Sequence, residues 1–219
     1  MTDVFAVPYV LVAVLAYLLG SIPTGFLVGK AKGIDVRKVG SGNIGATNAF
    51  RIFGKAAGSF VLLADALKGF LACKILAAGI AQMWAASDMA TLHEQLPIIA
   101  GVSAVLGHNF TCWLKFKGGK GIATSAGVLV AWVPWALLIV FVTWLVVFGA
   151  GRYVSLASIA AAVVLPFAVW GTGGGATFIF ITSALSALAI YKHKPNIRRL
   201  LDGTENRVGS NKTSLNSDR

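Results

Sequence analysis

The stretch Ile122–Phe148 decides how many times the chain crosses a membrane; it reads IATSAGVLVAWVPWALLIVFVTWLVVF. A helix needs about 20 apolar residues to cross the hydrocarbon of a bilayer, and this stretch is longer. It therefore forms either one long tilted helix or two shorter helices that turn near residues 132–135. Pro134 disfavours an uninterrupted helix, and Trp132 and Trp135 are residues of the type that collects where a membrane meets water.

The composition indicates a membrane protein rather than a soluble one. Of 219 residues, 57% are hydrophobic and only 12% are charged, and the mean hydropathy is +0.77. A soluble domain of this size rarely tolerates such values. Since backbone polar groups in lipid must be hydrogen-bonded within their own segment, long apolar runs of this kind cross as helices. We expect an all-α, polytopic integral membrane protein.

Five further stretches are apolar and long enough, or nearly so, to cross a bilayer as helices. They are Val4–Val28, Ala56–Gln82, Leu96–Trp113, Val154–Trp170 and Ala176–Tyr191. The first lacks a preceding basic segment and is longer than the apolar core of a signal peptide, so we expect it to be retained as a helix.

The distribution of Lys and Arg decides between one helix and two at Ile122–Phe148. With two helices the chain has seven spans, and 17 of its 19 Lys and Arg residues fall on one side, while Asp3, Asp88 and Glu94 lie in loops on the other. Basic loops stay in the cytoplasm, so we predict seven transmembrane helices with the N-terminus outside and the C-terminus in the cytoplasm. This retention also explains the net charge of +11 without nucleic-acid binding, for which the chain offers no soluble basic domain.

The chain shows no internal repeat and no second domain, so we predict a single membrane-embedded domain over residues 1–208. Residues 209–219 are rich in Ser, Asn and charge, which is typical of a disordered tail. Cys73 and Cys112 lie in or beside apolar stretches and do not make a disulfide framework, so we interpret them as packing residues.

Three segments at the ends of apolar stretches concentrate Gly, Lys, Arg, Ser and Asn: Gly40–Asn48, Lys115–Gly121 and Lys192–Arg199. Glycine lets backbone N–H groups close around an anion, and basic and hydroxyl side chains add further donors. In the seven-span topology all three segments face the cytoplasm. Together they predict one site that binds phosphate groups at that surface.

In the first segment, Ser41 and Thr47 offer hydroxyl groups, and Gly42 and Gly45 permit a positive φ. Arg51 can hold two phosphate oxygens at once. The alternative is that the glycines only form a tight turn at the membrane interface.

In the second segment, Gly118–Gly121 directly precedes an apolar helix, whose N-terminal N–H groups and dipole attract an anion. Lys120 is the cation that we expect at the site, whereas Lys115 and Lys117 are typical of residues that anchor a helix end to lipid headgroups. The segment is not a Walker A loop, because that loop requires Ser or Thr where Gly121 stands.

In the third segment, His193 and Asn196 lie three residues apart, and Pro195 between them suits the first turn of a short helix. Both side chains can then face one ligand, with His193 as a phosphate ligand or a base. The alternative is a solvated histidine at the interface.

The second predicted span contains Asp65 and Lys68, three residues apart on one helical face. Charges are costly inside a membrane, so the two should pair within the bundle. We interpret them first as a structural pair and second as support for the bound phosphate groups. His108 is equally open to a structural and a functional role.

At these segments, and over nearly its whole length, the chain resembles the PlsY family of bacterial acyl-phosphate:glycerol-3-phosphate acyltransferases. The resemblance rests on three blocks in a fixed order: Gly20–Gly25 with Gly40–Asn48, Gly107–Phe110 with Phe116–Thr124, and His193–Glu205. It implies seven helices in the bacterial cytoplasmic (inner) membrane, with the active site on the cytoplasmic face.

The resemblance also implies an activity in phospholipid synthesis. An acyl group passes from acyl phosphate to the sn-1 hydroxyl of glycerol 3-phosphate, which yields 1-acylglycerol 3-phosphate (lysophosphatidic acid) and inorganic phosphate. No cofactor, no metal, no acyl-CoA and no acyl carrier protein take part. The partners are the two substrates and the membrane lipids.

On this basis the predicted catalytic residues are Ser41, Arg51, Lys120 and His193. The predicted substrate-binding residues are Gly42, Asn43, Gly45, Thr47, Asn48, Gly118, Gly119, Gly121, Asn196 and Glu205. The resemblance points to an oxygen of the acyl phosphate as acceptor of the hydroxyl proton, with Ser41 and His193 as alternatives.

Other classes of function fit the residues less well. The His-x-x-x-x-Asp dyad of another acyltransferase family is absent, because Ile98, Trp113 and Arg198 stand five residues after the three histidines. A metal-dependent lipid synthase needs grouped acids, and the eight Asp and Glu residues are scattered. The remaining alternative is an organophosphate or anion transporter. Such a transporter typically has charged or broken helices near the middle of the membrane, in each of two paired repeats. Here only the second predicted span carries such charges.

Overall fold

The computed structural model describes residues 2–84 and 89–209, and every regular element in these residues is helical. The α-helices are α1 (Thr2–Ser21), α2 (Thr24–Ala31), α3 (Ala46–Leu71), α4 (Ala77–Met83), α5 (Met89–Asn109), α6 (Ile122–Trp132), α7 (Pro134–Gly151), α8 (Val154–Gly171), α9 (Ala176–Lys192) and α10 (Lys194–Leu201). A π-helical turn, η1 (Ala72–Leu76), joins α3 to α4, and a 3₁₀ turn, η2 (Cys112–Leu114), follows α5. The prediction of an all-α chain is confirmed within these ranges. Residues 210–219 of the predicted tail lie outside them.

Several of the described helices are long and apolar enough to cross a membrane. Four stretches qualify as they stand: Ala6–Ala31, which joins most of α1 to α2, Ala90–Leu114, Pro134–Gly151 and Val154–Gly171. The bent pair α9 and α10, which meet at 56°, makes a fifth if it is counted as one span. The count of seven spans and the placement of the termini remain predictions.

The stretch Ile122–Phe148 forms two helices, as Pro134 predicts. α6 ends at Trp132, Val133 leaves the helical region with φ −143° and ψ 65°, and α7 begins at Pro134. Proline is tolerated at the start of a helix because the first N–H there has no acceptor within the helix.

Two other predicted spans are interrupted. The predicted helix Val4–Val28 breaks at Ile22–Pro23, between α1 and α2, so one continuous helix is wrong there. The predicted span Ala56–Gln82 runs from α3 through η1 into α4. α3 itself turns sharply at Gly54, which has φ 82° and ψ −171° and separates the first two turns from the rest.

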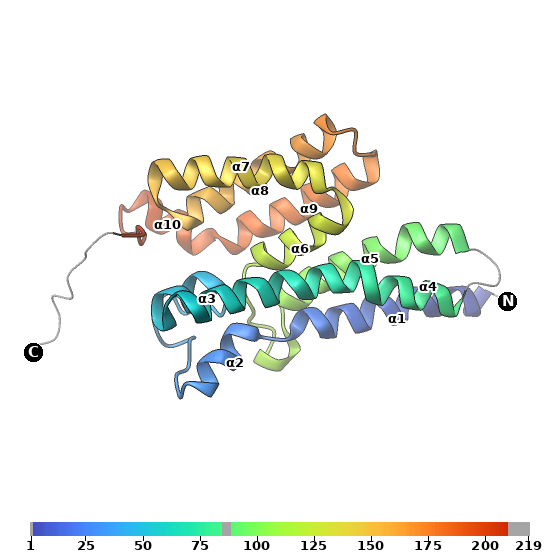
Figure 1. Ribbon diagram of the computed structural model, residues 1–219, viewed down its shortest axis with the longest axis horizontal. Helices are drawn as coiled ribbons and strands as arrows, with labels where there is room; N and C mark the ends of the chain where they lie inside the picture. The colour runs from blue at the N-terminus through green and yellow to red at the C-terminus, as the bar shows by residue number, and fades with distance from the viewer. Residues whose placement is uncertain (1, 85–88, 210–219) are drawn as a thin grey trace, which may run out of the picture. The chain divides into compact units, whose positions relative to one another are not determined.

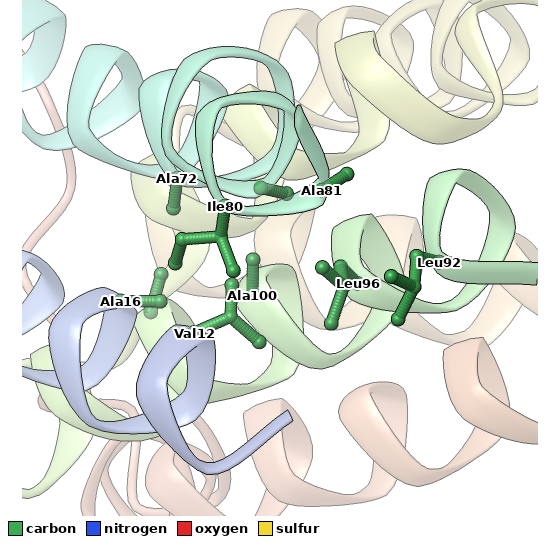
Figure 2. Packing of buried hydrophobic residues seen from close by; sticks show 10 residues of the cluster. Val12, Ala16, Ala72, Ile80, Ala81, Leu92, Leu96 and Ala100 are labelled. Atoms are coloured by element: carbon green, nitrogen blue, oxygen red, sulfur yellow. The ribbon is translucent and has the colours of Figure 1, made fainter. Parts of the chain in front are cut away.

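The chain folds into two compact units, Met1–Leu137 and Leu138–Arg219. In the first unit α1 packs along α5 and α3 along α6, and in the second α8 packs against α9 (Figure 1). Figure 2 shows side chains from α1, η1, α4 and α5 meeting in the core of the first unit, which contains Val12, Ala16, Ala72, Ala77, Ile80, Ala81, Leu92, Leu96, Ala100 and Ala104. The many alanines allow the helices to approach closely. The single domain predicted over residues 1–208 remains a prediction.

Candidate active site

The first predicted segment forms the loop that leads into α3. Gly40 and Gly42 have φ of 63° and 70°, in the left-handed region that glycine adopts without a steric penalty. Gly45 has φ −81° and ψ 171° and is the N-cap residue of α3, so it does not use the positive φ that glycine permits. Its N–H donates to Oδ1 of Asn43 over 2.8 Å, which closes a tight turn just before the helix.

The buried side chain of Asn48 holds this loop in shape. Its Oδ1 accepts the Ser41 N–H at 2.9 Å, and its Nδ2 donates to the carbonyl oxygens of Val36 and Val39, both at 3.1 Å. Because three bonds within the protein engage a side chain that is only 1% exposed, the structure gives Asn48 a role in positioning Ser41. The substrate contact predicted for Asn48 remains a prediction.

The side chains that can reach a ligand here come from the loop and from the first two turns of α3. Ser41 and Arg51 are exposed, and Thr47 is half-buried. The first N–H groups of a helix have no acceptor within the helix and attract anions. The loop and the first two turns of α3 therefore expose a hydroxyl group and a guanidinium group, on either side of a helix N-terminus in the sequence.

The second predicted segment packs against the C-terminal end of α5. The N–H groups of Gly118 and Gly119 donate to the carbonyl oxygens of Asn109 and His108, at 3.2 and 3.0 Å. A Cβ atom on Gly118 would overlap the carbonyl oxygen of His108, and one on Gly119 would overlap Nε2 of the same residue. Gly121, with φ 80°, is the N-cap residue of α6. Packing within the protein requires these glycines, and their predicted contacts to substrate remain predictions.

The three lysines of this segment differ in their surroundings. Lys120 is half-buried and directly precedes the N-cap residue of α6, whereas Lys115 and Lys117 are exposed. Lys115 and Phe116 have φ of 54° and 60°, which is uncommon for residues with a side chain. Lys120 is the cation of this segment that is best placed to meet an anion at a helix N-terminus.

A small apolar cluster joins the first two segments within the first unit. Val36 and Ile44 of the first loop pack with Leu114 of η2, and Phe26 and Phe53 pack around them. The structure therefore brings the loop that carries Ser41 next to the turn that leads to Lys120.

In the second unit, His193 lies at the junction of α9 and α10 and is 3% exposed. Its Nδ1 lies 2.7 Å from the carbonyl oxygen of Ala189. Because a carbonyl group only accepts, Nδ1 carries the hydrogen in this bond. The burial excludes the alternative of a solvated histidine.

Glu205 connects α8, α10 and the segment that follows α10. Its Oε1 accepts hydrogen bonds from Asn196 Nδ2 at 2.8 Å and Ser155 Oγ at 2.9 Å, and its Oε2 accepts one from Arg199 Nε at 2.7 Å. Burial raises the pKa of the Glu205 carboxyl, but the hydrogen bonds from Asn196, Arg199 and Ser155 outweigh it, so this pKa lies below its usual range. The substrate contacts predicted for Asn196 and Glu205 remain predictions.

The three predicted segments share one feature: each contains or directly precedes the N-terminus of a helix, namely α3, α6 or α10. The first two segments lie in the first unit and the third lies in the second. That all three form one site remains a prediction.

Asp65 and Lys68 pair as predicted, with 2.8 Å between Lys68 Nζ and Asp65 Oδ1. Two of their neighbours were not predicted. Thr24 Oγ1 donates to Asp65 Oδ1 at 3.0 Å, and His108 Nδ1 lies 3.0 Å from Lys68 Nζ. No local signal identifies Thr24 as a partner of Asp65, which lies 41 residues away. For His108, no local signal identifies a partner 40 residues away.

The comparison with known families agrees with this geometry. Residues 10–203 match the model of a family described as glycerol-3-phosphate acyltransferase. The chain belongs to the glycerol-3-phosphate acyltransferase family. It is 43% identical over 205 residues to the glycerol-3-phosphate acyltransferase of Desulforamulus reducens, which covers 93% of this chain and 97% of that protein. The glycerol-3-phosphate acyltransferase of Geotalea daltonii is 44% identical over 195 residues, 87% of this chain and 93% of that protein.

Two crystal structures of PlsY (YgiH), an integral membrane glycerol 3-phosphate acyltransferase, are similar to this chain. The glycerol 3-phosphate form matches with a TM-score of 0.82 at 39% identity, over 92% of this chain and 96% of that one. The lysophosphatidic acid form matches with a TM-score of 0.79 at 38% identity, over 92% and 95%. The chain is an integral membrane enzyme of the glycerol-3-phosphate acyltransferase family, and the resemblance to PlsY seen in its motifs is confirmed.

Proposed function

We propose that this chain transfers an acyl group from acyl phosphate to the sn-1 hydroxyl of glycerol 3-phosphate, giving 1-acylglycerol 3-phosphate and inorganic phosphate. The observation that carries the proposal is the family match over residues 10–203. The similarity to PlsY in a glycerol 3-phosphate form and a lysophosphatidic acid form supports it, because these two molecules are the acceptor and the product of this transfer.

Four residues act directly on the substrates in this proposal: Ser41, Arg51, Lys120 and His193. Two phosphate groups must be held close together against their mutual repulsion, which fixed cations and N–H donors achieve. Arg51 supplies a planar pair of donors for phosphate oxygens. Lys120 and the N-terminus of α6 supply positive charge at the neighbouring loop.

The reaction needs little proton chemistry from the protein. The hydroxyl oxygen of glycerol 3-phosphate attacks the carbonyl carbon, the new ester bond forms, and the bond from that carbon to the phosphate oxygen breaks. The hydroxyl proton moves to an oxygen of the departing phosphate, either directly, or through Ser41, which passes on its own hydroxyl proton, or by way of His193. Phosphate is a good leaving group, so positioning and stabilisation of charge account for most of the acceleration. Since Nδ1 of His193 donates to Ala189, a base role falls to Nε2.

The topology in this proposal has seven spans in the bacterial cytoplasmic membrane, with the N-terminus outside and the site on the cytoplasmic face. The Lys and Arg distribution supports it. In a variant without Cys73 and Cys112, single cysteines test the two sides. Lys38→Cys should react with an impermeant reagent only in inverted vesicles, and Glu94→Cys only in right-side-out vesicles. The reverse pattern would overturn the orientation.

The activity is tested with detergent-purified protein, radiolabelled glycerol 3-phosphate and one donor at a time: acyl phosphate, acyl-CoA or acyl carrier protein carrying an acyl group. We expect labelled 1-acylglycerol 3-phosphate with acyl phosphate alone, and none from Arg51→Ala. Product from another donor but not from acyl phosphate would refute the donor. Label that crosses sealed vesicles without acylation would favour a transporter.

A further inference from the structure

A buried polar cluster lies beside both loops of the first unit, formed by Asp65 and Lys68 of α3 with Thr24 and His108. Lys68 Nζ lies 2.8 Å from Asp65 Oδ1, 2.9 Å from the carbonyl oxygen of Ile22 and 3.0 Å from His108 Nδ1. An ammonium group has three N–H donors, so each one has an acceptor. Asp65 is 1% exposed and Lys68 is 5% exposed.

The protonation of His108 follows from its partner. Lysine only donates, so Nδ1 accepts and the hydrogen of the neutral ring is on Nε2. The cluster then contains one negative and one positive charge, and its net charge is zero. Burying such a pair in an apolar bundle costs less free energy than burying either charge alone.

His108 connects the cluster to the second loop. Its carbonyl oxygen accepts the N–H of Gly119 at 3.0 Å, and its ring lies where a Cβ atom on Gly119 would overlap Nε2. Lys68 therefore positions the ring against which Gly119 of this loop is packed.

Thr24 connects the cluster to the first loop. Its hydroxyl group donates to Asp65 Oδ1 at 3.0 Å, and it is the first residue of α2. The next residue, Gly25, touches that loop so closely that a Cβ atom would overlap the carbonyl oxygen of Ile44. Asp65 therefore holds the start of α2 against the loop that carries Ser41.

We propose that Thr24, Asp65, Lys68 and His108 are positioning residues that fix the Ser41 loop and the 118–121 loop relative to each other. The proposal rests on the proposed function, because it treats these loops as parts of the acyltransferase site. An ion pair that served stability alone would be replaceable by apolar residues of similar volume without effect on catalysis. A positioning cluster is not replaceable in that way.

The mildest test removes one hydroxyl group. Thr24→Val keeps the shape of the side chain but not its bond to Asp65, and Thr24→Ser restores the bond. Thr182→Val is the matched control: its hydroxyl group is also buried, and it donates to the carbonyl oxygen of Phe178 at 2.6 Å in the second unit. We expect Thr24→Val to raise the KM for glycerol 3-phosphate about 3- to 10-fold. Thr24→Ser and Thr182→Val should stay near the wild-type KM.

The second test replaces the charges, with the double variant Asp65→Asn and Lys68→Met. We expect kcat/KM to fall by roughly 100-fold or more in protein that still melts cooperatively, because several positioning bonds are lost together. The proposal is overturned if Thr24→Val and the folded double variant both retain the wild-type KM and kcat. Should the double variant fail to fold, Thr24→Val decides alone.

A third measurement needs no substrate. Hydrogen–deuterium exchange in Thr24→Val should be faster at the amides of Ser41, Gly118 and Gly119 than in wild type, and unchanged there in Thr182→Val. Unchanged exchange at these amides in Thr24→Val would contradict the proposal. If wild-type protein makes no acylated product, the proposed function fails, and the exchange data still decide whether the cluster fixes the loops.

Discussion

Gly127 of α6 lies against the carbonyl oxygen of Ala66 on α3, so closely that a Cβ atom on Gly127 would overlap that oxygen. Gly69 of α3 makes the reciprocal contact with the carbonyl oxygen of Thr124 on α6. Two glycines thus set the spacing of the helices that lead away from the two loops of the first unit. This relationship predicts where the fold is sensitive to a single methyl group.

Gly127→Ala should force α6 away from α3. Overpacking of this kind typically costs about 1–3 kcal/mol of stability. We expect a lower melting temperature in detergent. Gly149→Ala on α7 is the control, since nothing lies within 4 Å of a Cβ atom there, and alanine in a helix is favoured over glycine by roughly 0.5–1 kcal/mol. A melting temperature for Gly127→Ala as high as that of Gly149→Ala would refute the close contact.

Asn48→Asp should damage the first loop more than its small chemical change suggests. A carboxylate oxygen would replace the Nδ2 group that donates to the carbonyl oxygens of Val36 and Val39. Three acceptors would then face one another, and each buried polar group without a partner costs about 1–3 kcal/mol. We expect a lower melting temperature and faster amide exchange at Ser41.

The matched control for this prediction is Asn43→Asp. Oδ1 of Asn43 accepts a hydrogen bond from the N–H of Gly45, and an aspartate at this position keeps an oxygen that can accept it. The melting temperature of Asn43→Asp should therefore remain close to that of wild type. If Asn48→Asp is as stable as Asn43→Asp, the amide orientation assigned to Asn48 is wrong.

Local sequence signals predicted part of this structure. Pro134 predicted the break between α6 and α7, and the spacing of Asp65 and Lys68 predicted their pairing. Pro23 likewise stands at the break between α1 and α2, but the apolar run through it suggests one helix. Proline alone does not decide the matter, because Pro8 lies inside α1 without ending it.

Contacts between residues distant in sequence were not predictable in this way. The glycines of residues 118–121 suggest a phosphate loop, which remains a prediction, but nothing in their pattern indicates that they pack on His108 and Asn109. Glu205 accepts from Ser155, 50 residues earlier, and no motif connects the two. Gly45 permits a positive φ, but it is extended in the structure, where the Asn43 side chain accepts its N–H.

Arg51→Lys should impair acyl transfer although it keeps the charge. Lysine cannot offer two parallel donors to phosphate oxygens. We expect kcat/KM for glycerol 3-phosphate to fall about tenfold, the loss typical of one charge-assisted bond. Replacement by alanine should reduce kcat/KM further without preventing membrane insertion, at any one of Ser41, Arg51, Lys120 and His193.

Arg37→Lys is the control for Arg51→Lys. Its guanidinium group is also partly exposed, but Asp35 binds it at 2.8 Å and it stacks over the ring of Phe26. A general effect of losing a guanidinium group near the site would appear in both variants. If Arg51→Lys retains the kcat/KM of Arg37→Lys, bidentate binding by Arg51 is wrong.

Glu205 should make the protein sensitive to acid. Its pKa is lowered in the folded state, because the hydrogen bonds from Asn196, Arg199 and Ser155 outweigh the effect of burial. A carboxyl group with a lowered folded pKa contributes stability at a pH above its unfolded value, and that contribution is lost as the pH falls through the folded value. The unfolded value for glutamate is about 4.3, so the loss should begin near that pH and continue below it.

The measurement is the melting temperature in detergent between pH 7 and pH 3, for wild type and Glu205→Gln. Glutamine is neutral throughout this range, so the variant should be less stable at pH 7 and should lose less stability on acidification. The two curves should therefore converge as the pH falls. Parallel curves of melting temperature against pH would contradict this prediction. They would mean that the bonds from Asn196 and Arg199 are no stronger to the carboxylate than to the neutral acid, and that the charge of Glu205 does not hold α10 to α8.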